Sequence, residues 1–289
     1  MAPRTRNRLP IGGTLQEVAS KARVSKAAAS RVLNNLPVRV SERTRAGILA
    51  AAQAIGYRPN LIARALARRG SRSVGVVVPA ILTSFYPEII AALETRIRAR
   101  GCQALVCCSD DDPQHERQHL EDLLSRRVDG LAVSPVCGTA NEDLFETIRQ
   151  RRCPLIFFDR APEGCVGPQV TTDNRGAALE AVRFLAADGM SALAYFGEAG
   201  RNPALEDRLA GARESAALCV VEFGPDRVFL CCDREAVRQA CRRFLAAGPA
   251  RPGLFLESNR LLLGVLDALA DQGRFFPDHA ALVGFDAFH

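Results

Sequence analysis

From Ser73 onward, short apolar runs alternate with stretches that carry apolar residues at helical spacing. The runs form two series: SVGVVVP, ALVCC, GLAVSP and PLIFFD, then ALAYFG, RVFLCC, GLFLES and ALVGFD. Helical spacing lies between them near 85–100, 114–126 and 141–152, and later near 174–188, 204–217, 234–247 and 259–272. This alternation predicts parallel sheets with right-handed crossovers, and two series predict two doubly wound α/β lobes with a cleft between them.

Polar residues just after these runs are the candidate ligand site, because open α/β sheets bind ligands at the carboxyl ends of their strands. Arginine forks suit phosphate or carboxylate, and a carboxylate such as Asp159 can bridge vicinal hydroxyls. We expect a small polar, anionic ligand, although polar groups at strand ends are also common as simple caps. The expected ligand-binding residues are Phe85, Tyr86, Asp159, Arg160, Arg208, Ser258 and Asn259, with Ser109–Asp111 and Ser134 as further strand-end positions.

The charge is divided unevenly along the chain. Residues 1–72 contain 15 Lys and Arg but only two acids, Glu17 and Glu42, whereas the other 217 residues contain 23 basic and 30 acidic groups. A basic head of net charge +13 on an acidic body of −7 predicts that a polyanion binds at one end. A solvated arm would lack periodic apolar residues, and this segment has them.

Three short helices are expected in the head. Thr14 and Glu17 form a capping box, Ser25 can cap a second helix after a three-residue break, and Ser41 can cap a third that ends at Gly56. The expected inward residues are Leu15, Val18, Ala19 and Ala22, then Ala28, Ala29, Val32 and Leu33, then Ile48, Leu49, Ala52 and Ile55. This is a helix-turn-helix pattern, whose second helix can enter the major groove; a bundle that packs on another protein is the alternative.

Lys26 and Arg31 are the natural base readers, and Ala27 is small enough to touch a thymine methyl group. Ser25, Lys21 and Arg45 are expected at phosphates. A short helix can begin at Pro59–Asn60, and its Leu66 could act as an apolar wedge in the minor groove. A flexible linker is the alternative for this segment.

The string HERQH, residues 115–119, matches the H-E-x-x-H pattern of zinc proteases, in which two imidazoles and a glutamate share one helix face. Leu120, Leu123 and Leu124 mark the buried face of this helix, so both histidines are expected toward solvent. Because a zinc hydrolase also needs a third ligand, a chance match is the preferred interpretation.

The composition limits the remaining classes. No apolar run reaches the roughly 18 residues that span a bilayer, and the N-terminus lacks the apolar stretch of a secretion signal, so a cytoplasmic protein is expected. The ten cysteines form no C-x-x-C pair and several lie in apolar runs, which is typical of small buried side chains and not of metal or redox sites. No metal or other cofactor is expected.

The string TLQEVASKARVSKAAASRVLNN, with VSERTRAGILAAAQAIGYRPNLIARALARRGSRSVGVVVP after it, strongly resembles the start of the LacI/GalR repressor family. This resemblance implies a DNA-binding domain at 1–58, a hinge helix at 59–71 and a periplasmic-binding-protein-like effector domain at 72–289. It makes Lys26, Ala27 and Arg31 base readers and Leu66 the hinge wedge. The expected DNA-binding residues are Thr14, Ser25, Lys26, Ala27, Ser30, Arg31, Asn34, Tyr57, Asn60, Ala63 and Leu66.

The stretch CSDDDPQHERQHLEDLLSRRVDGLAVS resembles the fructose repressor subgroup, which responds to fructose phosphates. By the same resemblance, Asp159, Arg160 and Arg208 match the positions where the family holds its effector. The expected partners are double-stranded operator DNA, a sugar or sugar-phosphate effector and a second copy of the chain, in a homodimer or tetramer. An enzyme acting on a sugar phosphate and a solute-binding protein are the rival functions.

Two departures from the family pattern carry expectations of their own. Arg23 stands where the family has glycine, and a positive φ there would cost the head about 1 kcal/mol. The chain also stops at ALVGFDAFH, before the family's final crossover to the first lobe. On this basis the body is expected to be poorly stable and to dimerise badly.

Overall fold

The computed structural model describes residues 13–57, 71–82, 85–162, 167–190, 192–199, 202–249 and 251–286. The chain separates into two compact units, Met1–Ser71 and Arg72–His289. The predicted fold class, a helical head and an α/β body with two parallel sheets, is confirmed. Expected residues Asn60, Ala63 and Leu66 lie outside the described residues.

The head contains three helices, α1 (Leu15–Ala22), α2 (Lys26–Leu33) and α3 (Glu42–Ala54). Each begins at the expected side-chain cap, and Thr14 and Glu17 form both halves of the capping box. The buried core residues are Val18, Ala19, Ala29, Val32, Ile48, Ala51 and Ala52. The expectation for Leu49 was wrong: this side chain is 51% exposed, because Ala51 and not Leu49 shares the inward face with Ile48 and Ala52.

Arg23 ends α1 in the left-handed conformation, with φ 54° and ψ 45°. Its backbone N–H donates to the carbonyls of Ala19 and Ser20, which closes the tight turn into α2. Arg23 therefore has the positive φ considered from the sequence, and a residue with a Cβ atom adopts this φ only at a steric cost.

We expect Arg23→Gly to stabilise the head by about 1 kcal/mol, because glycine adopts this conformation without steric cost. Amide hydrogen exchange in α1 and α2 would slow accordingly, by roughly fivefold. Lys21→Gly, on the exposed side of the last turn of α1, is the control and should speed exchange instead. Equal effects of the two glycines would contradict this explanation.

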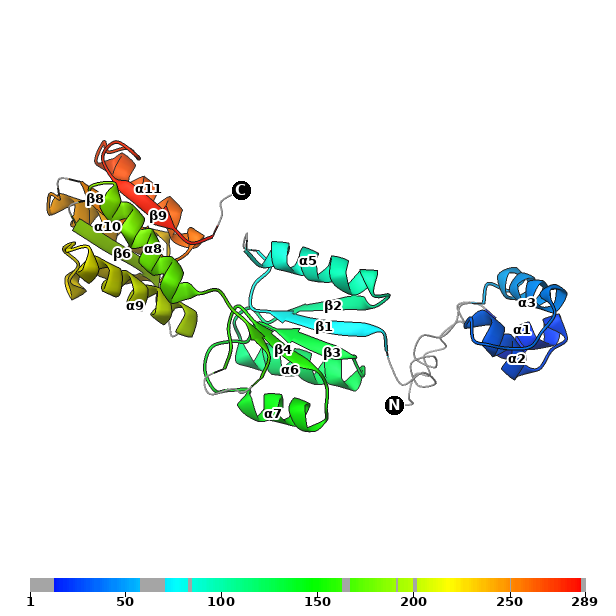
Figure 1. Cartoon of the computed structure of the whole chain (residues 1–289). Helices are drawn as coiled ribbons and strands as arrows, with labels where there is room; N and C mark the ends of the chain where they lie inside the picture. The colour runs from blue at the N-terminus through cyan, green and yellow to red at the C-terminus, as the bar shows by residue number, and fades with distance from the viewer. Residues whose placement is uncertain are drawn as a thin grey trace, which may run out of the picture. The chain divides into compact units, whose positions relative to one another are not determined.

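The first lobe of the body has a five-stranded parallel sheet in the order β2-β1-β3-β4-β5. Its strands are β1 (Ser73–Val78), β2 (Gln103–Cys108), β3 (Gly130–Val133), β4 (Leu155–Phe158) and β5 (Gln169–Val170). Helix α5 (Phe85–Ala99) covers one face, while α6 (Pro113–Ser125) and α7 (Glu142–Gln150) cover the other (Figure 1). The sheet therefore has an apolar layer on each side, as a doubly wound fold requires.

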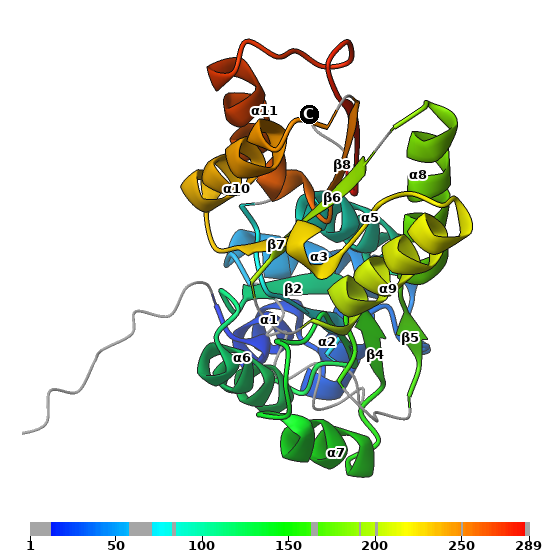
Figure 2. The ribbon, with the colours of Figure 1, turned by 90° about the vertical axis from the view of Figure 1, so that its left-hand side faces the viewer.

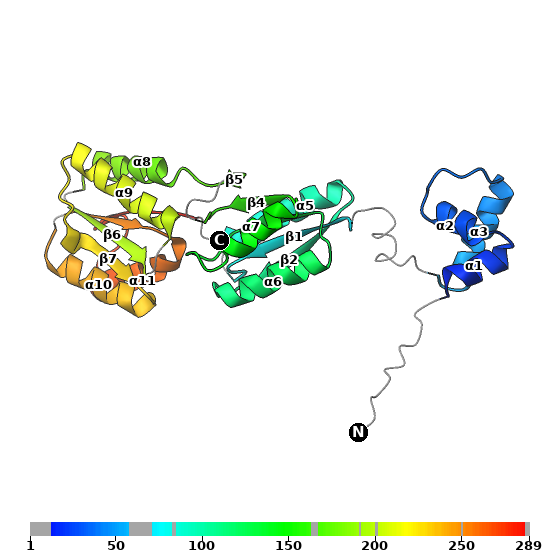
Figure 3. The same ribbon diagram turned by 90° about the horizontal axis from the view of Figure 1, so that it is seen from below.

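The second lobe has a four-stranded parallel sheet in the order β7-β6-β8-β9. Its strands are β6 (Ala192–Glu198), β7 (Val228–Cys231), β8 (Pro252–Leu256) and β9 (Ala281–Gly284). Helices α8 (Asn174–Ala187) and α9 (Pro203–Leu218) pack against each other on one face (Figure 2). Helices α10 (Arg234–Ala246) and α11 (Leu262–Asp271) cover the other face (Figure 3).

Candidate functional site

The carboxyl ends of strands from both lobes border one cavity, called here the ligand cleft. All seven ligand-binding residues expected from the sequence line it: Phe85, Tyr86, Asp159, Arg160, Arg208, Ser258 and Asn259. Parallel strands bring these segments together because their carboxyl ends lie at the same edge of each sheet.

On the first lobe, Asp159 is the centre of a hydroxyl network. The Tyr86 hydroxyl donates to Asp159 Oδ2 at 2.6 Å and lies 3.2 Å from Ser134 Oγ. Burial raises the pKa of Tyr86, so the phenol stays a hydrogen-bond donor. Asp159 directly follows β4 and has φ 62°, which turns it out of the strand. A carboxylate fixed in this way can accept hydrogen bonds from ligand hydroxyls.

Arg160 is next to this network, with a side chain that is 17% exposed. Its Nη1 donates to Asp111 Oδ1 at 2.7 Å, and its Nε lies 3.8 Å from Asp159 Oδ2. Asp111 follows β2, so this pair links the ends of two strands that are separated in the sheet by β1 and β3.

On the second lobe, Arg208 is only 7% exposed and is held on three sides. Its Nε donates to Asn174 Oδ1 at 2.8 Å, its Nη1 donates to the Glu257 carbonyl at 2.5 Å, and its guanidinium stacks 3.9 Å from the Phe285 ring centre. These contacts fix the orientation of the fork before any ligand arrives, which reduces the entropy lost on binding.

Two glutamates of the second lobe make hydrogen bonds of their own. Glu198 accepts from Ser258 Oγ at 2.5 Å and from Arg260 Nη1 at 3.1 Å. Glu257 is 2% exposed, and its carboxylate accepts from the Tyr195 hydroxyl at 2.6 Å. Burial raises the pKa of Glu257 above its ordinary value.

We expect Glu257→Gln to change how the stability of the body depends on pH. Because the pKa of Glu257 is raised in the folded state, the proton stabilises the fold below about pH 4.5, and this contribution is lost as the pH rises through the folded pKa. The free energy of unfolding of the parent chain, relative to that of the variant, should therefore fall as the pH rises above about 4.5. Urea titrations at several pH values measure this. Glu180→Gln, at an exposed carboxylate, is the control, and a parallel pH profile in parent and Glu257→Gln would contradict the prediction.

The expected set omitted Asp286, which also lines the ligand cleft. It follows β9 with φ 69°, and burial raises its pKa. The same strand-end rule that selected Asp159 would have found it, because GFD closes the last apolar run. Glu198, at the end of β6, also lines the ligand cleft and was also omitted, although the same rule applies to it.

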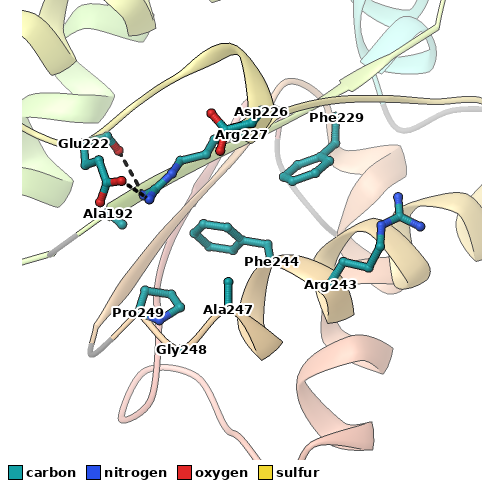
Figure 4. A pocket seen from close by; sticks show the side chains of 10 residues that line it. All are labelled: Ala192, Glu222, Asp226, Arg227, Phe229, Arg243, Phe244, Ala247, Gly248 and Pro249. Carbon is teal, nitrogen blue, oxygen red and sulfur yellow. Dashed lines mark hydrogen bonds and ion pairs between the residues drawn. The ribbon is translucent and has the colours of Figure 1, made fainter.

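A second hollow, drawn in Figure 4, lies at the amino ends of β6 and β7. Its accessible volume is about 600 Å³, and its lining includes Arg227, Arg243 and Phe244. Arg227 forms an ion pair with Glu222 and donates to the Glu222 carbonyl at 3.3 Å. Because this hollow is at the opposite end of the sheet from the strand carboxyl ends, it is the weaker candidate for a ligand site.

In the head, three candidate base readers are exposed on α2. Lys26 and Ala27 occupy the first two positions of the helix, and Arg31 follows five residues after Lys26. Arg31 Nε donates to the Pro37 carbonyl at 2.9 Å, which ties its stem to the loop after α2. Lys26 and Ala27 therefore lie at the start of the helix, whereas Arg31 lies in its last turn.

The other described head candidates have local roles. Thr14 and Ser25 accept from the backbone N–H groups of Glu17 and Ala28 as helix caps. The Asn34 amide donates to the Ser30 carbonyl at 2.8 Å, and Tyr57 packs against the head core.

The HERQH motif lies on α6, and its glutamate points inward. Glu116 is 1% exposed; it accepts from the Val136 backbone N–H at 2.6 Å and from the Asn141 amide at 2.8 Å. The expectation that both histidines face solvent is correct for His115 and wrong for His119, whose Nε2 lies 3.0 Å from the Cys108 carbonyl. The glutamate is thus an anchor for the loop after β3.

Comparisons with known proteins agree with this division. Residues 14–60 match the family described as "Bacterial regulatory proteins, lacI family", and residues 74–289 match "Periplasmic binding protein domain". The fructose operon regulatory protein of Vibrio cholerae is 32% identical, over 90% of this chain and 79% of its own length. The sucrose operon repressor of Klebsiella pneumoniae is 31% identical, over 94% and 82%.

Solved structures show the same fold. The lac repressor dimer bound to operator and the anti-inducer ONPF superimposes with a TM-score of 0.81, at 23% identity over 96% of this chain and 83% of that one. Within the described residues, no helix is both long and apolar enough to cross a bilayer.

Proposed function

Since this chain belongs to the lacI family of bacterial regulatory proteins, we propose that its ligand cleft senses a small sugar or sugar phosphate and thereby controls operator binding by the head. The chain is a DNA-binding transcriptional regulator and not an enzyme. Fructose phosphates are the first candidates for the effector, because a fructose operon regulator is among the relatives. The cytoplasm, where operator DNA is accessible, is the proposed location.

One observation carries the proposal: both lobes contribute rigidly held polar groups to the same cleft. Asp159, fixed by Tyr86, can accept from sugar hydroxyls, and Arg208, fixed by Asn174 and the Glu257 carbonyl, can donate to sugar or phosphate oxygens. A ligand that contacts both residues favours the closed arrangement of the lobes. Its binding energy then shifts the population that is competent to bind the operator.

At the DNA, two copies of the chain would place their α2 helices in successive major grooves of a pseudo-palindromic operator. Lys26, Ala27 and Arg31 would contact bases, while Thr14, Ser25, Ser30, Asn34 and Tyr57 would lie at or near the backbone. Asn60, Ala63 and Leu66 complete the proposed set.

Gel retardation on fragments of the source genome, with and without a panel of plain and phosphorylated sugars, tests the proposal. We expect retardation of specific fragments and a change of affinity with one class of sugar. A chain that retards no fragment in dilute buffer, or whose binding no sugar alters, would contradict it.

A further inference from the structure

The buried side chain of Glu257 joins the ends of the two central strands of the second lobe. Glu257 directly follows β8, and its backbone N–H donates to the Phe196 carbonyl on β6 at 2.9 Å. Its carboxylate then reaches β6 twice: Oε2 accepts from the Tyr195 hydroxyl at 2.6 Å, and Oε1 accepts from the Glu198 backbone N–H at 3.3 Å. We call these two side-chain contacts the Glu257 clasp.

The strand ends joined by the clasp carry polar groups of the ligand cleft. Glu198 lines the cleft from β6 and Ser258 lines it from the end of β8, and their side chains form a hydrogen bond of 2.5 Å. The Glu257 carbonyl accepts from Arg208 Nη1 at 2.5 Å. Among the described residues that line the cleft, Glu257 itself is absent. Its side chain can therefore act on a ligand only through these neighbours.

Gly197 provides the space that the clasp occupies. A Cβ atom at this position would lie 2.5 Å from Glu257 Oε2 and 3.0 Å from Tyr195 Cε1, closer than non-bonded atoms pack. The tyrosine cannot move aside, because it is fully buried and its ring stacks on Phe255 with 5.0 Å between the ring centres. A residue larger than glycine would therefore push the carboxylate out of the clasp.

Stability alone does not explain a carboxylate at this position. Burial penalises its charged form and raises the pKa of Glu257, an effect that the nearby Arg208 opposes and the nearby Glu198 reinforces. Replacing both partners of a buried polar pair by apolar side chains is commonly neutral or stabilising. The geometry that the clasp imposes on the strand ends is the property that an apolar pair would lack.

We propose that Glu257 is a positioning residue for effector binding, whose clasp fixes Arg208, Glu198 and Ser258 in the geometry that binds the ligand. The proposal rests on the proposed function, since it concerns the affinity of the same cleft for its effector. Its consequence is specific: loss of the clasp weakens effector binding without destabilising the body.

The double variant Tyr195→Phe/Glu257→Met separates these two quantities. Both partners become apolar side chains of similar size, so its unfolding temperature should match or exceed that of the parent. Fructose, fructose 1-phosphate and fructose 6-phosphate are titrated into the whole parent chain by calorimetry, and the tightest binder of the three is then titrated into each variant. We expect the double variant to bind it about tenfold or more weakly than the parent, because the cleft is no longer pre-organised.

Glu257→Gln is the rescue variant. Its amide oxygen can accept from the Glu198 N–H and its amide nitrogen can donate to the Tyr195 hydroxyl oxygen, so affinity should stay within about threefold of the parent. Ser215→Ala is the control, because it removes a buried hydrogen bond of the same lobe, from Ser215 Oγ to the Leu179 carbonyl at 2.8 Å, outside the ligand cleft. It should lower the unfolding temperature and leave effector affinity unchanged.

Gly197→Ala decides the question if the double variant does not fold. Its methyl group displaces Glu257 Oε2 while both partners of the clasp remain, and we expect effector binding about fivefold or more weaker than in the parent.

Affinity within about threefold of the parent, in the folded double variant or in Gly197→Ala, would overturn the proposal. So would a loss in Glu257→Gln as large as that in the double variant. The failure of the proposed function is distinct: the parent itself would then bind none of the sugars, and the role of Glu257 would fall with it. If a sugar changes operator retardation equally in the parent and in the double variant, the function stands and only the role of Glu257 is refuted.

Discussion

Arg208→Ala is expected to abolish the response to effector while operator binding without effector stays intact. The guanidinium is buried at the cleft and pre-oriented by Asn174, the Glu257 carbonyl and the Phe285 ring. Losing its charged hydrogen bonds to the ligand costs about 1.5–3 kcal/mol, which is roughly a ten- to hundredfold loss of effector affinity. Calorimetry with the effector and retardation of operator DNA measure the two quantities separately.

Arg213→Ala is the matched control, because Arg213 lies on the same helix, α9, and is exposed. It should leave both quantities unchanged. Truncating Arg208 also leaves the Glu257 carbonyl without a donor, so the thermal unfolding of the variant must be measured to show that the body is folded. Loss of operator binding together with effector binding, in a folded variant, would count against two separate sites.

Arg31→Ala is expected to relax the sequence preference of the head. A bidentate contact from arginine to a base contributes about 1–3 kcal/mol of discrimination, so the ratio between operator and altered operator should fall by about tenfold or more at one base pair. The substitution also removes the hydrogen bond from Arg31 Nε to the Pro37 carbonyl, so part of the loss of binding will come from the loop after α2. Titrations on operators changed at single positions separate a base-specific loss from a uniform one.

Arg43→Ala provides the comparison, since Arg43 is exposed on α3 and not on α2. Loss of a phosphate contact at Arg43 would weaken binding to every sequence alike and reduce the salt dependence of binding. A uniform loss in Arg31→Ala, with the same pattern as Arg43→Ala, would show that Arg31 binds phosphate and does not read a base.

Most of the fold could be predicted because its signals are local. The caps at Thr14, Ser25 and Ser41 begin their helices as expected. Where the prediction failed, the deciding contacts are between elements: Leu49 has apolar spacing, yet Ala51 takes the buried position in the three-helix core. The spacing of apolar residues shows that a helix has an apolar face, but it does not show which of these residues lie in the middle of that face.

The candidate site was predicted less completely. The strand-end rule placed Asp159 and Arg208 in one cleft but was not applied to Asp286, at the end of the last strand. Glu116 could not be assigned, because its partners Val136 and Asn141 are 20 and 25 residues away in sequence. Long-range hydrogen bonds of this kind leave no periodic pattern in the sequence.

The end of β9 has one further consequence. Phe285 supports the Arg208 guanidinium from behind, and the next residue, Asp286, lines the cavity itself. A library that randomises these two neighbours to build a biosensor for a new sugar would therefore alter hydrogen-bond recognition and arginine placement together. Randomising Asp159, on the opposite lobe, would likewise remove the acceptor of the Tyr86 hydroxyl and the carboxylate beside Arg160.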